Sequence, residues 1–342
     1  MAKDLLLSYI LPCYNTGLYL KQCVESLLDQ GFKSDEYEII CVNNASTDNT
    51  AEILDTLSSC HSIIKVITLP VNRCSGGAYN AGLDIAQGKY IQFVDSDDYL
   101  DEGVGKMLYD LMESKGLDML YFNIESFCEK DRLTHIDTLR FNGNLKEDID
   151  GVSGEQFVEQ YLHYARIDTM PVPAYRKIIL RKKLTQNRIR FTHTTIGTDF
   201  LHNIELLAKL SKIAGITKRV YFFRYNPNGV TKSRMTSEKI IYALNNYCKA
   251  YLIAKCSFLS DFVKDEFCKE MESTINGYLS SIKYLAYSEK KNIYTHLQYE
   301  EVLRSVSKGL YNRFYVAYPC VCVKSSLLLT PKFYRFLDKI KK

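Results

Sequence analysis

The chain of 342 residues, with 46% hydrophobic and 25% charged side chains, has the composition of an ordinary globular protein with room for a sizeable core. The formal net charge of +4 gives no reason to expect a nucleic-acid partner, but it conceals an asymmetry. Residues 1–110 carry 7 Lys and Arg against 16 Asp and Glu, so the rest of the chain is basic. We expect a cation site in the acidic part and an anionic partner for the basic part.

Cysteine usage and the N-terminal segment indicate where the protein works. The 11 cysteines are scattered from Cys13 to Cys322 without a CxxC pair, and several, such as Cys41, lie inside apolar runs. This usage is typical of a reducing compartment and argues against a disulfide scaffold. The apolar run near the N-terminus is too short to span a membrane, and no small-residue cleavage site follows it. We therefore expect a cytoplasmic protein.

The first 125 residues alternate between strand-like and helix-like patterns. We expect strands at 4–11, 37–43, 63–69, 89–95 and 117–124. We expect helices at 18–30, 46–59, 76–88 and 102–114. This alternation predicts an α/β fold with a mostly parallel sheet and helices on both faces. Ligands of such sheets bind beyond the carboxyl ends of the strands, which is where polar residues fall at 12–15, 43–48 and 95–98.

The pattern of apolar and polar residues changes after residue 125. Residues 126–150 are polar and rich in Gly and Asp, which predicts a loop or an insertion. From residue 153 the pattern is mainly helical, with one strand-like run at 215–225. Residues 236–310 predict two or three long helices rich in tyrosine. We therefore expect a mainly helical C-terminal region.

An acidic D-x-D, Asp95-Ser96-Asp97, follows the apolar run that ends at Val94. Alone it is a weak signal, because a solvated turn explains two acids as well. At a strand end, however, alternate carboxylates can converge on Mg²⁺ or Mn²⁺, which keeps open positions for a substrate diphosphate. The chain has no GxGxxG after its first strand, no GxxxxGK[ST] and no HExxH, so dinucleotide, P-loop and zincin sites are disfavoured.

Several blocks of the chain resemble the family 2 glycosyltransferases with the GT-A fold. They are SYILPCYNTGLYLKQCVESLLDQ, IICVNNASTDNT and NRCSGGAYNAGLDIAQGKYIQFVDSDDYL, followed by the looser PAYRKIILRKKL, IRFTHTTIGTDFLHN and VYFFRYNPNGVTKS. The resemblance implies a GT-A-like domain at 1–234. Its nucleotide-sugar-binding half would be 1–125 and its acceptor-binding half 126–234. Residues 235–342 would form a helical C-terminal region with a basic, aromatic tail.

The resemblance implies inverting transfer of a sugar from a nucleotide diphosphate, most simply a UDP-sugar, to an acceptor hydroxyl with Mn²⁺ or Mg²⁺. It makes Asp199 the catalytic base and Asp97 the direct metal ligand, with Asp95 at the ribose or in the metal's shell. Asp98 would instead cap the following helix. The residues implied to bind the nucleotide-sugar are Pro12, Tyr14, Asn15, Asn43, Asn44, Arg73, Asn80, Asp95, Ser96, Arg224 and Tyr225.

Three positions depart from the family pattern. Asn43 and Asn44 replace acidic residues; their amides could pair with a base edge or serve only a turn. Tyr79 stands where the family has a phosphate-facing Arg, and Arg73 could substitute for it. Thr198 precedes Asp199 where the family has Glu-Asp, and either residue could cap the helix that follows.

Other features carry weaker predictions. His202 could pair with Asp199 on a metal, but a core or exposed histidine is the simpler reading. His193 and His202 are the alternative candidates for the catalytic base. From Val306 the tail has eight Lys and Arg against one acid, Asp338, interleaved with aromatic residues. That pattern suits a peripheral contact with the anionic inner face of the plasma membrane, or an ordinary basic helix.

The sequence as a whole favours a glycosyltransferase of surface polysaccharide or glycolipid synthesis, acting on a saccharide or a lipid-linked saccharide. A non-catalytic nucleotide-sugar-binding protein of the same fold is one alternative. A sugar-1-phosphate nucleotidyltransferase is another, although it should carry a Gly- and Arg-rich loop after its first strand, and PCYNTGLYL is not one. Homo-oligomer formation stays open.

Overall fold

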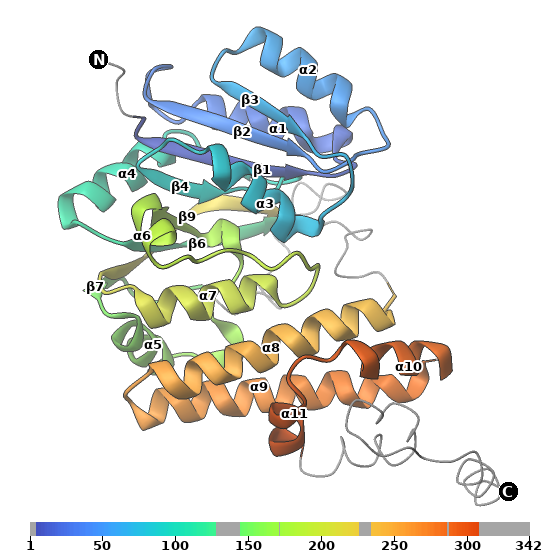
Figure 1. The fold of residues 1–342 in the computed structure, drawn as a ribbon. Helices are drawn as coiled ribbons and strands as arrows, with labels where there is room; N and C mark the ends of the chain where they lie inside the picture. Colours follow the sequence, from blue (N-terminus) through green and yellow to red (C-terminus); the bar gives the residue numbers. More distant parts are fainter. Residues whose placement is uncertain (1–4, 128–143, 171, 226–233, 286, 308–342) are drawn as a thin grey trace, which may run out of the picture.

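A nine-stranded sheet forms the centre of the computed structural model, which describes residues 5–127, 144–170, 172–225, 234–285 and 287–307 (Figure 1). Its strands are β1 (Leu7–Cys13), β2 (Tyr37–Asn43), β3 (Ile64–Thr68), β4 (Tyr90–Phe93), β5 (Tyr99–Leu100), β6 (Met119–Phe127), β7 (Ile149–Val152), β8 (Lys177–Leu180) and β9 (Ile213–Arg224). The order across the sheet is β3-β2-β1-β4-β8-β6-β9-β5, and β7 pairs with β9.

Most strands run in one direction. The pairs β1–β2, β1–β4, β2–β3 and β6–β9 are parallel, whereas the short strands β5, β7 and β8 lie antiparallel to their neighbours. Because β8 is antiparallel to both β4 and β6, those two point the same way. The predicted α/β fold with a mostly parallel sheet is confirmed.

The helices connect these strands and then continue beyond them. They are α1 (Gly17–Leu28), α2 (Thr50–Cys60), α3 (Cys74–Ile85), α4 (Val104–Lys115), α5 (Gly154–Leu162), α6 (Arg181–Gln186), α7 (Thr198–Lys209), α8 (Ser237–Ser257), α9 (Asp261–Ser281), α10 (Tyr287–His296) and α11 (Glu300–Val306). Short 3₁₀ turns occur at η1 (Ile167–Thr169), η2 (Ala174–Arg176) and η4 (Ile282–Tyr284).

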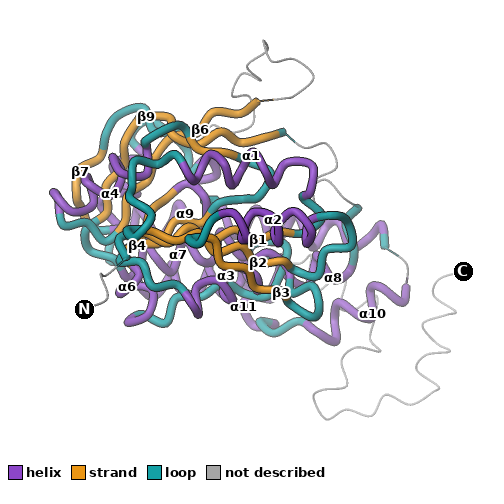
Figure 2. The backbone as a smooth tube through the Cα atoms, turned by 90° about the horizontal axis from the view of Figure 1, so that it is seen from above, coloured by secondary structure: helices purple, strands orange, loops and turns teal. Residues whose placement is uncertain are grey.

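Helices cover both faces of the sheet. Tyr9 and Leu11 of β1 pack with α1, α2 and α4, whereas Ile10 of the same strand packs with α3 and α7 on the opposite face. This follows the two-residue period of a strand. Figure 2 shows α1 and α2 on one side of β1–β3 and α3 on the other. Because both faces are covered, every residue of β2 is buried, and YEIICVN is mostly apolar, with Glu38 paired to Lys65.

The long helices α8 and α9 form a hairpin outside α7 (Figure 1). Ala250 of α8 and Phe267 of α9 share one core with Leu207 of α7, while Leu244 and Ile275 form a second core with α10 and α11. The predicted helical C-terminal region is therefore packed against the sheet-containing part. In the described part of the chain, no helix has both the length and the apolarity needed to cross a bilayer.

The structure adds strands that the sequence did not predict. The strand at 37–43 matches β2, but β5, β7 and β8 were missed, and β8 lies in the region read as mainly helical. These strands have two to four residues, and an apolar run as short as KIIL carries no usable period. Much of the predicted 126–150 insertion, residues 128–143, lies outside the described residues.

Candidate active site

Three loops that follow parallel strands meet at the carboxyl edge of the sheet. Cys13 at the end of β1 lies opposite Asn43 at the end of β2 in the strand register. The loop after β4 joins them, because the Ser96 hydroxyl donates to the carbonyl of Pro12 (2.8 Å). The polar segments that the sequence placed at strand ends therefore lie together, as predicted.

The loop after β1 is bound to the loop after β2 through Asn15. Its side-chain Oδ1 accepts a hydrogen bond from the Thr47 N–H (2.8 Å), and its own N–H donates to the Ser46 hydroxyl (3.1 Å). Pro12 is half-buried, whereas the Tyr14 side chain is 43% exposed. Of the residues predicted to line the nucleoside pocket in this loop, Tyr14 is thus the one with an open ring face.

The two asparagines after β2 are buried and engaged with nearby backbone. Asn43 Oδ1 accepts from the Ser46 N–H (3.0 Å). Asn44 Oδ1 accepts from the Arg73 N–H (2.8 Å), and its Nδ2 donates to the carbonyl of Cys74 (3.1 Å). These contacts support the turn role that the sequence left open. The Arg73 side chain is exposed where α3 begins, and the nucleotide contacts of all three residues stay predictions.

The Asp95 carboxylate is held by a tyrosine hydroxyl. Tyr79 of α3 donates to its Oδ1, and the Asp95 N–H donates to the Tyr221 hydroxyl of β9 (3.0 Å). Burial and the charge of Asp97 raise the pKa of Asp95 to about 7, although the hydrogen bond from Tyr79 lowers it. The charge of Asp199 raises this pKa further, so α7 brings another carboxylate within electrostatic reach.

Asp98 fastens the turn after β4 to strand β9. Its side chain is 1% exposed and accepts from the Tyr221 hydroxyl and from the Arg224 N–H, both at 2.7 Å. Burial and the two neighbouring aspartates raise its pKa. Helix α4 begins only after Gly103 and has no side-chain cap. The prediction that Asp98 caps this helix is therefore wrong, because the turn directs the carboxylate to β9 instead.

Arg224 and Tyr225 lie beside the acidic turn, at the end of β9. Arg224 Nε donates to the carbonyl of Asp97 (2.7 Å), and the guanidinium lies over the rings of Tyr19 and Phe127 at 4.5 and 4.6 Å. The Tyr225 N–H donates to the carbonyl of Phe127 (2.8 Å). The predicted proximity to the D-x-D is present, and contact with a diphosphate stays a prediction.

Asp199 lies in the first turn of α7, next to a buried lysine. Lys177 is fully buried, and its Nζ donates to Asn203 Oδ1 (3.0 Å) and to the carbonyl of Val172 (2.9 Å). Burial raises the pKa of Asp199, and the charge of Lys177 opposes that rise. Burial also lowers the pKa of Lys177 to about 7. A carboxylate made more basic in this way suits a general base.

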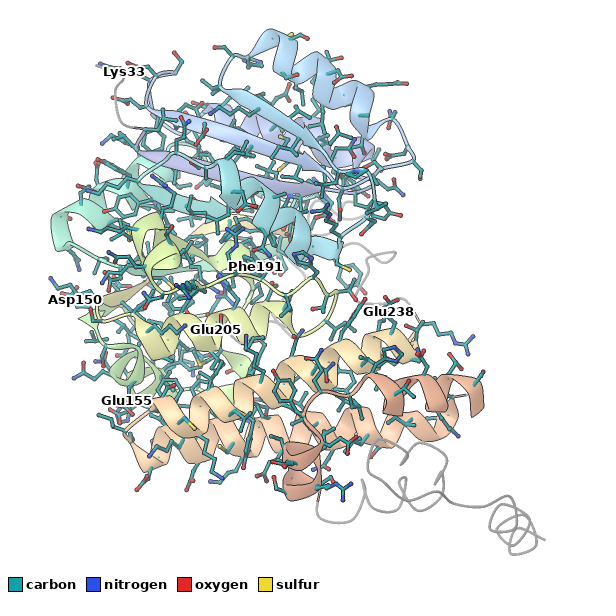
Figure 3. All side chains as sticks on the ribbon, in the orientation of Figure 1. Lys33, Asp150, Glu155, Phe191, Glu205 and Glu238 are labelled. Atoms are coloured by element: carbon teal, nitrogen blue, oxygen red, sulfur yellow. The ribbon has the colours of Figure 1, made fainter. Side chains whose placement is uncertain are left out.

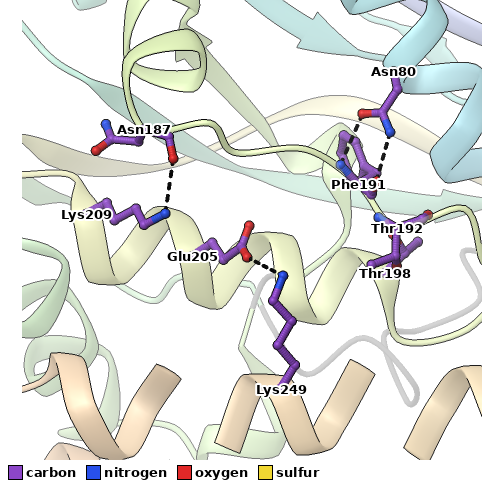
Figure 4. Close-up of polar contacts among 8 residues, drawn as sticks. All are labelled: Asn80, Asn187, Phe191, Thr192, Thr198, Glu205, Lys209 and Lys249. Atoms are coloured by element: carbon purple, nitrogen blue, oxygen red, sulfur yellow. Dashed lines mark hydrogen bonds and ion pairs between the residues drawn. The ribbon is translucent and has the colours of Figure 1, made fainter. Parts of the chain in front are cut away.

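Neither Thr198 nor Asp199 caps α7, contrary to the capping alternative. The residue before the helix is Gly197, and no side chain caps it. The Thr198 hydroxyl instead donates to the carbonyl of Thr192 (3.1 Å), and the Thr192 N–H donates back to that hydroxyl (3.1 Å) (Figure 4). Thr198 therefore ties the preceding loop to the helix.

His202 is a core residue. It is 1% exposed, and its ring stacks on Phe191 with centroids 3.9 Å apart and meets Phe93 edge to face. Burial lowers its pKa well below the ordinary histidine value. Figure 3 labels Phe191, which lies in the connection from α6 to α7 where that connection passes beside α3. The reading of His202 as a structural residue is supported, whereas His193 is exposed.

Asn80 clamps this loop to α3. Its Nδ2 donates to the carbonyl of Phe191 (2.8 Å), and its Oδ1 accepts from the Phe191 N–H (3.1 Å) (Figure 4). The Asn80 side chain is 6% exposed. This pair of bonds joins the predicted nucleotide-sugar half to the predicted acceptor half, and the role of Asn80 toward a nucleotide-sugar stays a prediction.

The acidic turn fits a hard divalent cation held partly by substrate. Among the residues described, no three His, Cys, Asp or Glu side chains gather closely enough to hold a metal ion. Mg²⁺ commonly takes only one or two protein carboxylates and completes its shell with phosphate oxygens and water. Asp95 and Asp97 are both half-buried in this turn, and the role of Asp97 as the direct metal ligand stays a prediction.

Sequence reasoning missed three residues of this site. Tyr79 was noted only as the loss of an Arg, and Tyr221 and Lys177 were not singled out. Tyr221 occurs in VYFFR, where alternate residues share one face of the strand, so a hydroxyl directed at the acidic turn could have been considered. Lys177 precedes the apolar IIL, which is an unusual place for a charge.

The carboxylate-rich site lies at the carboxyl edge of an open α/β sheet, which is where enzymes with such sheets bind their ligands. The sequence model of Glycosyl transferase family 2 matches residues 8–182, which is half of the chain. The chain therefore belongs to glycosyltransferase family 2, as the sequence blocks predicted.

Known relatives agree with this assignment. Glycosyltransferase GlyG of Streptococcus pneumoniae is 29% identical over 242 residues, which cover 67% of this chain and 73% of GlyG. Poly(ribitol-phosphate) beta-N-acetylglucosaminyltransferase TarP of Staphylococcus aureus is 26% identical over 253 residues, covering 71% of each. The structure of S. aureus TarS 1–349 in complex with UDP-GlcNAc is 19% identical, covers 92% of both chains and has a TM-score of 0.67. The TarS likeness supports the GT-A fold.

Asp95→Asn should stabilise the metal-free protein at neutral and alkaline pH. The pKa of Asp95 is about 7 in the folded chain and about 3.9 in an unfolded one. Between these values the folded state holds a proton that the unfolded state releases, so wild-type stability falls as pH rises from about 4 to about 7. We expect equal stability near pH 4 and a gain of about 1–4 kcal/mol at pH 8, measured by urea denaturation with EDTA.

A matched control is Glu102→Gln, which removes an exposed carboxylate from the nearby connection between β5 and α4. It should leave the pH dependence unchanged. A gain from Asp95→Asn that is the same at pH 4 and pH 8 would contradict the raised pKa.

Proposed function

We propose that this chain transfers a sugar from a UDP-sugar to a hydroxyl of a growing cell-surface saccharide, with inversion at the anomeric carbon. The observation that carries the proposal is that Asp199, at the start of α7, lies within electrostatic reach of the turn that carries Asp95 and Asp97. The UDP-GlcNAc complex of TarS supports a UDP-sugar donor. The name of TarP, which acts on poly(ribitol-phosphate), supports a polymer with free hydroxyl groups as the acceptor. Family membership favours transfer over nucleotidyl transfer or passive binding.

The reaction needs one displacement. The acceptor oxygen attacks the anomeric carbon, the bond from that carbon to the diphosphate oxygen breaks, and the hydroxyl proton passes to Asp199. Asp199 suits this role because burial makes its carboxylate more basic, while the nearby Lys177 favours its ionised form. Attack from the face opposite the leaving group inverts the anomeric centre.

Mn²⁺ or Mg²⁺ held by Asp97 would neutralise charge on the departing diphosphate. Asp95, fixed by Tyr79, would contact the ribose or the water shell of the metal. Arg224 would contact the diphosphate after releasing or extending its present contact with the Asp97 backbone. A cytoplasmic location and membrane contact through 306–342 stay predictions, since residues 308–342 lie outside the described residues.

Asp97→Asn should abolish metal-dependent binding of UDP while leaving the fold intact. An amide is a far weaker ligand for a hard cation than a carboxylate, and the Arg224 bond to the backbone of Asp97 is unaffected. Calorimetric titration of UDP with and without Mn²⁺ measures the effect. Glu102→Gln is the control, since its carboxylate lies exposed in the nearby connection between β5 and α4. Metal-dependent affinity that survives in Asp97→Asn would remove Asp97 from the metal site.

Asp199→Asn should lower the rate of sugar transfer by about 10²- to 10⁴-fold with unchanged UDP affinity. The free energies of unfolding of Asp199→Asn and the wild type are best compared at pH 8. The pKa of Lys177 is already about 7 and falls further without Asp199, so the lysine is neutral there. Transfer is measured with the UDP-sugar that most raises the melting temperature in a screened panel.

The control for this variant is Glu205→Gln on the same helix, where the carboxylate pairs with Lys249. It should transfer sugar at close to the wild-type rate. Wild-type transfer by Asp199→Asn would mean that another group is the base, and His193 would be tested next.

A further inference from the structure

The loop of residues 192–197 leads directly into the helix that carries Asp199. On one side, Asn80 of α3 holds Phe191 at the start of this loop by two hydrogen bonds (Figure 4). At its end, the Thr198 hydroxyl bonds back to the Thr192 backbone. The position of the Asp199 carboxylate therefore depends on how this loop is fixed.

Helix α8 fixes the middle of the loop through one buried side chain. Asn246 is 4% exposed, and its Nδ2 donates to the Thr194 hydroxyl (2.9 Å) and to the carbonyl of Ile196 (2.8 Å). The Thr194 hydroxyl is in turn 2.9 Å from that of Thr192. One amide nitrogen thus satisfies a hydroxyl and a backbone carbonyl at two points of the same loop.

Gly197 lets the loop approach α8 this closely. Its φ of +76° lies in the left-handed region, which favours glycine. A Cβ added there would lie 3.1 Å from Cβ of Asn246 and 3.3 Å from Cε2 of Tyr247. Gly197, the residue just before α7, therefore lies close against α8.

We propose that Asn246 is a positioning residue for sugar transfer and that α8 completes the acceptor side of the active site. The proposal rests on the proposed function of Asp199. Residue 246 lies beyond the 8–182 segment matched by the family model, so nothing in that match assigns it a role. Asn246 acts through the loop and the start of α7 and does not itself touch the reacting atoms.

The chemistry of the contact requires an amide. An asparagine nitrogen offers two N–H groups, which match the two acceptors, whereas a carboxylate of the same shape offers none when ionised. Removing the donor leaves the Ile196 carbonyl and the Thr194 hydroxyl without this partner in a part-buried place, so the loop would move to find other partners. A displacement of about 1 Å at a catalytic group can reduce a rate by about 10²-fold.

Asn246→Ala and the isosteric Asn246→Asp should each lower kcat for transfer by about 10- to 100-fold. UDP affinity by calorimetry should stay within about twofold of wild type, because the loss belongs to the transition state and not to donor binding. Amide hydrogen exchange of residues 192–198 should become faster in both variants. Thr194→Val removes one of the two acceptors and should produce the same changes to a smaller extent.

The matched control is Lys249→Ala. Lys249 also joins α8 to α7, through its 3.0 Å pair with Glu205, but that contact lies away from the loop (Figure 4). If the Asn246 variants acted only by weakening the contact between α7 and α8, Lys249→Ala would lower the rate of sugar transfer as well. Loop positioning predicts that only the Asn246 and Thr194 variants lose kcat and gain exchange at 192–198.

The proposal would be overturned if both Asn246 variants kept the wild-type kcat. It would also be overturned if UDP affinity fell by the same factor as the rate of transfer. Failure of the proposed function would look different. In that case the wild type would transfer no sugar from any UDP-sugar, or Asp199→Asn would be fully active. Unchanged exchange at 192–198 in the Asn246 variants would show that the contact does not hold the loop, whatever the activity.

Discussion

The site is organised by the need to satisfy carboxylates that the fold buries. A carboxylate taken out of water loses several kcal/mol of hydration free energy, and strong hydrogen bonds are needed to offset that loss. Asp98 meets this need with the Tyr221 hydroxyl and the Arg224 N–H, both on β9. Those two bonds hold the turn after β4 against the end of β9. The D-x-D and Arg224 consequently lie side by side before any ligand arrives.

The same constraint joins the rest of the site to the sheet. Tyr79 binds Asp95 and thereby fixes α3, and the next residue, Asn80, clamps the loop that leads to Asp199. Lys177 then offsets the charge of Asp199 from the start of β8. Raised carboxylate pKa values cost stability, and such groups are concentrated at functional sites. The clustering of raised carboxylate pKa values therefore supports a functional site at this edge of the sheet.

The sequence was sufficient to predict the elements whose signal lies within a short segment of the chain. The apolar runs and helical spacings located β1, β2, β3, β4 and β6 and the helices between them, and the acidic turn was correctly placed at a strand end. The partner of Asp98 could not be predicted, because Tyr221 lies 123 residues away and is brought there only by the pairing of β9. β8 was missed because four residues are too few to show a period. Asn246 was missed because its partner Thr194 lies 52 residues earlier, in the loop before α7. An asparagine within a helical pattern gives no sign of such a contact.

In the proposed mechanism, one displacement with Asp199 as base moves the sugar from its nucleotide. The most direct test is the anomeric configuration of the product, read by NMR from the transferred sugar at early reaction times. With UDP-GlcNAc or another donor whose sugar is α-linked to the diphosphate, the account predicts a β-linked product. An α-linked product would require two displacements or attack from the same face, and would contradict the single-step role assigned to Asp199.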